Sequence, residues 1–91
     1  MTIVKIKIVT FEYSKEACKY LKRSSKKNWI KDKIKKFLGF YPPSGDISLL
    51  NGVFSGKIRL HIGDFRVIFE YKNNYTKIKI LKIGPRGDVY K

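Results

Sequence analysis

The sequence predicts an α+β fold in which one sheet carries two helices on one face. Three observations support this class. Residues 3–11 and three segments between residues 56 and 84 alternate apolar and polar side chains, as half-buried strands do. Residues 14–40 instead repeat their apolar side chains at spacings of three and four, as helices do. Short turns join the late segments, so these should form a three-stranded antiparallel meander in one sheet with the first strand, covered by the helical hairpin.

The first strand and the first helix follow from local patterns. IVKIKIVTF, residues 3–11, places isoleucine and valine on one side and lysine on the other, which is typical of a strand. Ser14 is a suitable N-cap for a helix. Ala17, Tyr20 and Leu21 then share one helical face. We therefore expect a strand followed by a short amphipathic helix.

The second helix has the clearest pattern in the chain. The pair Ser24–Ser25 interrupts the first helix, and Ser25 is the expected N-cap of the next. KKNWIKDKIKKFLGF, residues 26–40, follows with charges on one side, and Gly39 is the expected stop. The apolar face consists of Ile30, Ile34, Phe37 and Leu38.

A loop and a hairpin come next. FYPPSGD, residues 40–46, contains two prolines and a glycine, which predict a loop. ISLLNG, residues 47–52, leads into GKIRLHIGDFRVIFEY, residues 56–71, which reads as two strands. The turn between them is Gly63–Asp64, where glycine suits the positive φ of a type II′ turn.

The last strand is expected over YTKIKILKIG, residues 75–84, after a turn at Asn73–Asn74. Its alternation slips between Ile80 and Leu81, which predicts a β-bulge at that point. The chain then ends in PRGDVYK.

The hairpin has one apolar and one basic side. With Gly63–Asp64 as the turn, Leu60 faces Val67, and His61 faces Arg66 on the reverse side. The basic side carries Lys57, Arg59, His61 and Arg66. Such a side is either a functional cluster or an ordinary solvated sheet face, on which Lys57 and Glu70 would form a simple cross-strand ion pair.

Composition limits the partners of the protein. The 91 residues suit one domain, and 43% hydrophobic residues argue against disorder. The formal net charge is +14, spread along the whole chain, which favours a polyanionic partner, with nucleic acid first. The alternative is a surface solvated by lysine without such a partner. The single cysteine, Cys18, excludes an internal disulfide and is expected to be buried, and no apolar run is long enough to span a membrane. We therefore expect a cytoplasmic protein without a metal or other cofactor.

Two stretches resemble motifs of the RelE/ParE superfamily of toxins from toxin–antitoxin modules. LLNGVFSGKIRLHIGDFRVIFEY, residues 49–71, is similar to the family's hairpin with its basic residues, and IGPRGDVYK, residues 83–91, is similar to its C-terminal ending. The element order of strand, two helices and three strands is also that of the superfamily. The resemblance covers essentially the whole chain and implies a single RelE-like toxin domain over residues 1–91.

The RelE-like branch cuts mRNA in the ribosomal A site, and the resemblance implies the same ribosome-dependent endonuclease activity here. The implied reaction is metal-independent attack by the RNA 2′-hydroxyl, which arrests translation. The implied catalytic residues are Lys57, Arg59, Arg66, Arg86 and Tyr90, with His61 as an additional candidate outside the family-wide set. The implied partners are a cognate antitoxin protein, mRNA and rRNA, with no membrane and no small-molecule cofactor.

Two departures from the family pattern leave the acid and base assignments open. Arg59 stands where many members have lysine, and Gly87 follows Arg86 where relatives often have a second basic residue. The alternatives are a ParE-like, non-catalytic inhibitor of DNA gyrase, or an inactive member that only binds its antitoxin. All three share the fold, so the fold alone does not choose among them.

Overall fold

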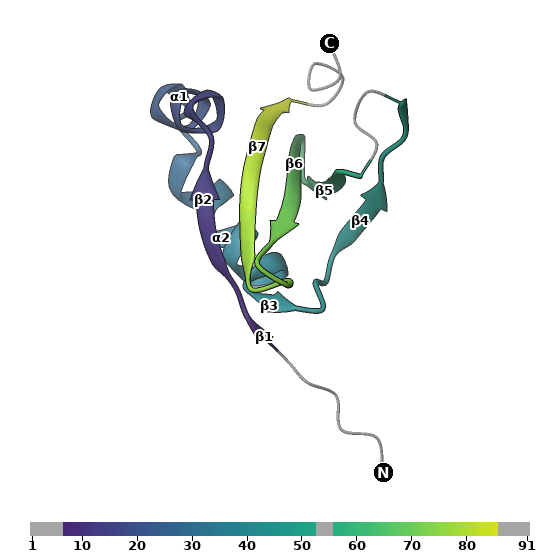
Figure 1. The fold of residues 1–91 in the computed structure, drawn as a ribbon. Coiled ribbons are helices and arrows are strands. Elements are labelled where there is room, and N and C mark those ends of the chain that lie inside the picture. The colour runs from purple at the N-terminus through teal and green to yellow at the C-terminus, as the bar shows by residue number, and fades with distance from the viewer. Residues whose placement is uncertain (1–6, 53–55, 86–91) are drawn as a thin grey trace.

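The protein is built on a five-stranded sheet in the order β2-β7-β6-β5-β4 (Figure 1). The computed structural model describes residues 7–52 and 56–85. β2 runs parallel to β7, and the other neighbouring strands are antiparallel. The strands of this sheet are β2 (Thr10–Tyr13), β4 (Asp46–Leu49), β5 (Ile58–Ile62), β6 (Phe65–Lys72) and β7 (Lys77–Pro85). A short second sheet pairs β1 (Lys7–Ile8) with β3 (Phe40–Tyr41).

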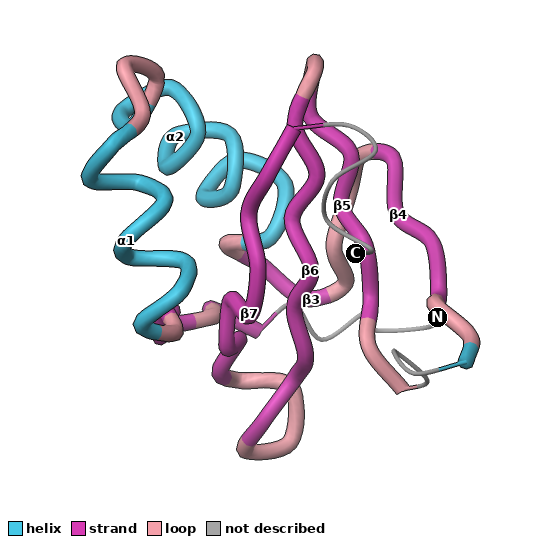
Figure 2. The backbone as a smooth tube through the Cα atoms, turned by 90° about the horizontal axis from the view of Figure 1, so that it is seen from above, coloured by secondary structure: helices cyan, strands magenta, loops and turns pink. Residues whose placement is uncertain are grey.

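Two helices, α1 (Lys15–Arg23) and α2 (Lys27–Leu38), lie on one side of the large sheet (Figure 2). This arrangement confirms the predicted α+β class. No helix in residues 7–52 and 56–85 is long and apolar enough to cross a membrane.

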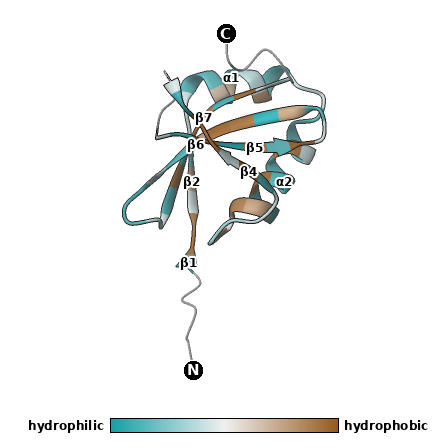
Figure 3. Cartoon of the chain, turned by 90° about the vertical axis from the view of Figure 1, so that its right-hand side faces the viewer, coloured by the Kyte–Doolittle hydropathy of each residue, from teal (hydrophilic) through white to brown (hydrophobic). Residues whose placement is uncertain are grey.

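The core lies between the helices and the facing side of the sheet. Every third or fourth residue of α2 turns inward, and the sheet contributes every second residue of β5 and β6. Figure 3 shows hydrophobic residues concentrated along the central strands. The fully buried members of this cluster are Ala17, Ile30, Ile34, Leu38, Leu60, Val67, Phe69, Ile78 and Ile80. The predicted apolar faces of the two helices and of the hairpin are therefore confirmed.

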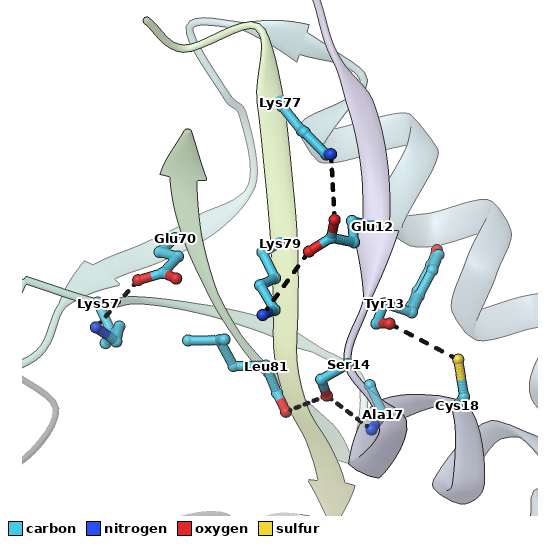
Figure 4. A network of polar contacts seen from close by, with 10 residues as sticks. All are labelled: Glu12, Tyr13, Ser14, Ala17, Cys18, Lys57, Glu70, Lys77, Lys79 and Leu81. Atoms are coloured by element: carbon cyan, nitrogen blue, oxygen red, sulfur yellow. Dashed lines mark hydrogen bonds and ion pairs between the residues drawn. The ribbon is translucent and has the colours of Figure 1, made fainter. Parts of the chain in front are cut away.

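Ser14 caps α1, as predicted, and also binds the sheet. Its hydroxyl oxygen accepts a hydrogen bond from the Ala17 N–H at 3.0 Å and donates one to the Leu81 carbonyl at 2.7 Å. Figure 4 shows both contacts. Leu81 is the bulged residue of β7, because Ile68 pairs with Lys82 while Phe69 pairs with Ile80. The predicted bulge is thus confirmed, and the Ser14 hydroxyl satisfies a carbonyl at the irregularity.

The predicted N-cap of α2 is wrong. Lys26, not Ser25, occupies the cap position, and no side chain caps this helix. The hydroxyl of Ser24 instead accepts a hydrogen bond from the Lys26 N–H at 3.1 Å, so the serine pair shapes the connection rather than the helix start. The stop at Gly39 is confirmed, since α2 ends at Leu38 with Gly39 as its C-cap.

The strand boundaries differ from the prediction in three places. The first strand is interrupted at Val9, whose N–H donates to the Gly39 carbonyl, and residues 3–6 of the predicted strand lie outside the described residues. The predicted loop over 40–46 contains β3, which pairs with β1. The lead-in over 47–52 contains most of β4, which makes the antiparallel meander four strands rather than three.

The hairpin between β5 and β6 has the predicted register. Leu60 pairs with Val67, and His61 pairs with Arg66. Gly63 at the turn has a φ of +56°, a conformation that favours glycine. By contrast, Cys18 is exposed, although the sequence predicted a buried thiol.

Replacing Ser14 with alanine should lower the free energy of unfolding by about 0.5–2 kcal/mol, because the helix loses its cap. The Leu81 carbonyl also loses its donor. Urea unfolding followed by circular dichroism measures the change. Ser25→Ala is the matched control, since no described contact uses the Ser25 hydroxyl, and it should stay within about 0.5 kcal/mol of the wild type. Equal effects of the two changes would contradict the capping role.

The pH dependence of stability should report the environment of Tyr71. Burial, with smaller contributions from Tyr41 and Tyr75, raises the pKa of Tyr71 from 10.0 to about 12. A folded-state pKa above the unfolded one means that the stabilisation is complete below pH 10 and is lost as the pH rises toward 12. Tyr71→Phe should therefore lose less stability over this range than the wild type. Tyr75→Phe removes only one of the smaller contributions and should keep most of the wild-type dependence, and identical alkaline unfolding in all three proteins would contradict the assignment.

Candidate functional site

The side of the sheet that faces away from the helices carries the predicted cations. We call this side of β5, β6 and β7 the basic face; its charged members include Lys57, Arg59, His61, Arg66, Glu70, Lys79 and Lys82. Strand alternation places them opposite the core residues Leu60 and Val67. All seven side chains are half-buried, so they lie along the sheet instead of extending fully into solvent.

Lys57 is held in an ion pair. Its Nζ lies 3.0 Å from Oε2 of Glu70 on β6, as Figure 4 shows. This is the cross-strand ion pair predicted from the sequence as the alternative to a functional role for Lys57. The carboxylate of Glu70 compensates the charge of Lys57 locally. Lys57 is therefore placed to shape and stabilise the face.

Arg59 is oriented by the neighbouring edge strand. Its Nη2 donates a hydrogen bond of 2.9 Å to the hydroxyl of Ser48 on β4. A hydroxyl is neutral, so this contact fixes the guanidinium without changing its charge. On its other side Arg59 pairs in register with Ile68, which is fully buried although it lies on the basic face.

His61 also has a partner on β4. Its Nδ1 lies 3.2 Å from Oδ2 of Asp46, the residue directly opposite in the ladder. The second ring nitrogen, Nε2, is buried and makes no hydrogen bond to any described residue. The imidazole is thus anchored at one nitrogen and unsatisfied at the other.

Arg66 lies beside the hairpin turn. It pairs in register with His61 on one side and with Gly84 of β7 on the other. Gly84 is buried and has no side chain, so Arg66 has a flat neighbour at this point of the face. Arg59, His61 and Arg66 are consequently adjacent on two rigid paired strands.

Acidic residues compensate the lysines of β7 on the basic face. Glu12 on β2 lies 3.1 Å from Lys77 and 3.8 Å from Lys79 (Figure 4). The hydrogen bond and charge of Lys77 lower the pKa of Glu12. Lys82 pairs with Glu16 at 3.8 Å. The cations of β7 are therefore engaged in holding β2 and α1 to the sheet.

The structure brings together four of the six predicted site residues. Lys57, Arg59, His61 and Arg66 lie on one face, whereas Arg86 and Tyr90 lie outside the described residues. Sequence reasoning missed Asp46 and Ser48, because it assigned their segment to a loop and a lead-in. The alternation of polar and apolar residues in D-I-S-L could have indicated a strand that sends both side chains to the basic face.

Two hollows of the structure do not include the hairpin cations. A hollow of about 700 Å³ lies between α1 and β7, and one of about 390 Å³ lies beside the β6–β7 turn, but none of the four hairpin cations lines either hollow. Within residues 7–52 and 56–85, no group of three or more His, Cys, Asp or Glu side chains could hold a metal ion. The arrangement offers fixed guanidinium donors and an oriented imidazole to an extended anion.

Comparison with known proteins gives structural relatives only. No family model matches the sequence, and no curated protein matches it. The archaeal RelE–RelB complex from Pyrococcus horikoshii contains a similar chain, with a TM-score of 0.67 and 27% identity over 90% of this chain and 99% of that one. The toxin–antitoxin complex RelBE2 from Mycobacterium tuberculosis gives a TM-score of 0.68 and 17% identity over 87% and 99% of the two chains.

A third similar structure is a YoeB/ParE toxin from Agrobacterium tumefaciens, with a TM-score of 0.59 and 10% identity over 86% of this chain and 99% of that one. At such identities the mycobacterial and agrobacterial likenesses show the fold alone. They agree with the archaeal relative and with the hairpin motif on which the resemblance was based. The chain has the fold of the RelE/ParE toxin superfamily.

Proposed function

We propose that this chain is the toxin of a type II toxin–antitoxin module and that it cuts mRNA on the ribosome without a metal ion. The observation that carries the proposal is the adjacent set of Arg59, His61 and Arg66 on two paired strands. Paired strands hold side chains more rigidly than a loop does, and a cleavage site needs its groups in fixed positions.

The reaction that suits this set is attack of the RNA 2′-oxygen on the neighbouring phosphorus. It requires a base for the 2′-hydroxyl, donors for the charge that develops on the phosphate, and a proton for the leaving 5′-oxygen. Arg59 and Arg66 supply guanidinium groups, which stay charged and bind phosphate in a bidentate manner. Lys57 is held on the same face by its pair with Glu70, and by resemblance it would also act at the reacting nucleotide. By resemblance, Arg86 would act on the leaving group and Tyr90 would contact the reacting nucleotide.

The partners follow from the same proposal. The similar archaeal and mycobacterial structures are toxin–antitoxin complexes, which supports a cognate antitoxin for this chain. The net charge of +14 suits contact with mRNA and rRNA in the ribosomal A site. A toxin with these partners would act in the cytoplasm.

Replacing Arg66 or Arg86 with alanine should abolish growth arrest on induction and slow mRNA cleavage by about 100- to 1000-fold, as loss of a charge-stabilising donor does. The measurement is single-turnover cleavage of ribosome-bound mRNA. Arg23→Ala removes the same charge from the exposed end of α1 and is the matched control, which should keep full activity. Circular dichroism of each variant checks the fold, and full toxicity of both site variants would rule out the proposal.

A gyrase-inhibiting activity is the second candidate, because one similar structure carries the ParE name. Induction of the protein alone, with mRNA 5′ ends mapped on and off ribosomes, separates the two activities. The mRNA-cutting toxin should produce new 5′ ends within ribosome-bound messages and no DNA-damage response. Intact messages together with a DNA-damage response would favour gyrase as the target.

A further inference from the structure

We infer that His61 is the general base of the proposed cleavage and that Asp46 is the residue that positions it. This inference rests on the proposed function and adds a role for β4, which the resemblance does not assign. Its starting point is the contact of 3.2 Å between His61 Nδ1 and Asp46 Oδ2 across the β4–β5 ladder.

The contact determines which nitrogen is available. An ionised carboxylate only accepts hydrogen bonds, so Nδ1 must carry the proton that is shared with Asp46. In the neutral imidazole, Nε2 then holds the lone pair and can accept a proton. Nε2 is also the nitrogen that has no hydrogen-bond partner among the described residues. A buried polar atom without a partner is unfavourable, and a substrate hydroxyl would satisfy it.

The surrounding charges suit a base at this position. The charged groups that face His61 in the described structure are Asp46 on β4, Arg59 on its own strand and Arg66 on β6, while β7 contributes Gly84 at this level. Asp46 stabilises the imidazolium that forms when Nε2 takes a proton. Arg59 and Arg66 lie within the same patch as the phosphate ligands, so base and phosphate donors are neighbours. Asp64 and Glu70 have no comparable position beside the ring.

The proton and bond changes are balanced. Nε2 takes the proton of the 2′-hydroxyl while the 2′-oxygen forms a bond to phosphorus. The bond from phosphorus to the 5′-oxygen breaks, and the leaving oxygen takes a proton from solvent or from the general acid. The products are a 2′,3′-cyclic phosphate and a 5′-hydroxyl. Nε2 has less than 1 Å² of exposed surface, so the groups that cover it have to move before the 2′-hydroxyl can reach it.

The first test does not depend on cleavage. Long-range ¹H–¹⁵N NMR spectra of the full chain near pH 8 should show that His61 carries its proton on Nδ1 and that Nε2 is unprotonated. Asp46→Asn should shift the ring to a mixture of the two tautomers, and Asp64→Asn, an exposed carboxylate in the hairpin turn, should leave it unchanged. A wild-type ring protonated at Nε2 instead would overturn the inference.

The second test follows single-turnover cleavage of ribosome-bound mRNA between about pH 5 and about pH 8, where histidine changes charge. The wild-type rate should fall as the pH falls, since Nε2 becomes protonated. His61→Ala should reduce the rate by about 100- to 10,000-fold and flatten this dependence. Added imidazole should restore part of the activity. Asp46→Asn should slow cleavage at least about tenfold, Asp46→Glu should recover most of the rate, and Asp64→Asn should have no effect.

The outcomes separate the two proposals. If the wild-type protein cuts mRNA and the folded His61→Ala variant keeps its rate and pH dependence, the general-base assignment is wrong while the proposed function stands. His61→Asn serves as a second variant where alanine impairs folding. If the wild-type protein cuts no mRNA on ribosomes, the proposed function fails and the assignment fails with it.

Discussion

The β-bulge at Leu81 is the irregularity on which the two faces of the sheet depend. Without the extra residue, strand alternation would turn Lys82 into the core and Ile83 out of it. With the bulge, Ile80 and Ile83 both face the helices, and Lys82 stays on the basic face. The carbonyl at the bulge is satisfied by the hydroxyl of Ser14, which also caps α1. Ser14 thus connects the first turn of α1 to the β-bulge of β7.

The basic face differs from a simple patch of positive charge. Its lysines are largely engaged with carboxylates, as in the pairs of Lys57 with Glu70 and of Lys79 with Glu12. The arginine Arg59 is instead oriented by the hydroxyl of Ser48. The net charge of the chain therefore says little about where chemistry takes place. What distinguishes the hairpin is that two guanidinium groups and one imidazole have fixed neighbours on adjacent strands.

The sequence was sufficient for those features that depend on alternation and on single turn residues. The register of the hairpin follows from Gly63, and the cap of α1 from Ser14, because each of these signals acts locally. β4 was missed because its four residues lie between a proline-containing loop and a glycine-containing one, so that turn signals outweighed a short alternation. Asp46 and Ser48 lie on β4, so they were missed together with that strand. Their roles depend on the pairing of β4 with β5, which is a separate segment of the sequence. Cross-strand partners of this kind appear only when the ladder is known.

The fold alone does not decide between an RNA-cutting and a gyrase-binding member of the superfamily, since both activities occur on the same scaffold. The side chains of β4 provide a better criterion. A surface that only binds another protein has no need for a carboxylate that determines the tautomer of a histidine, whereas proton transfer does. The contact between Asp46 and His61, beside Arg59 and Arg66, combines tautomer control with phosphate donors in one patch. That combination is the physical reason to favour catalysis over simple binding at the basic face.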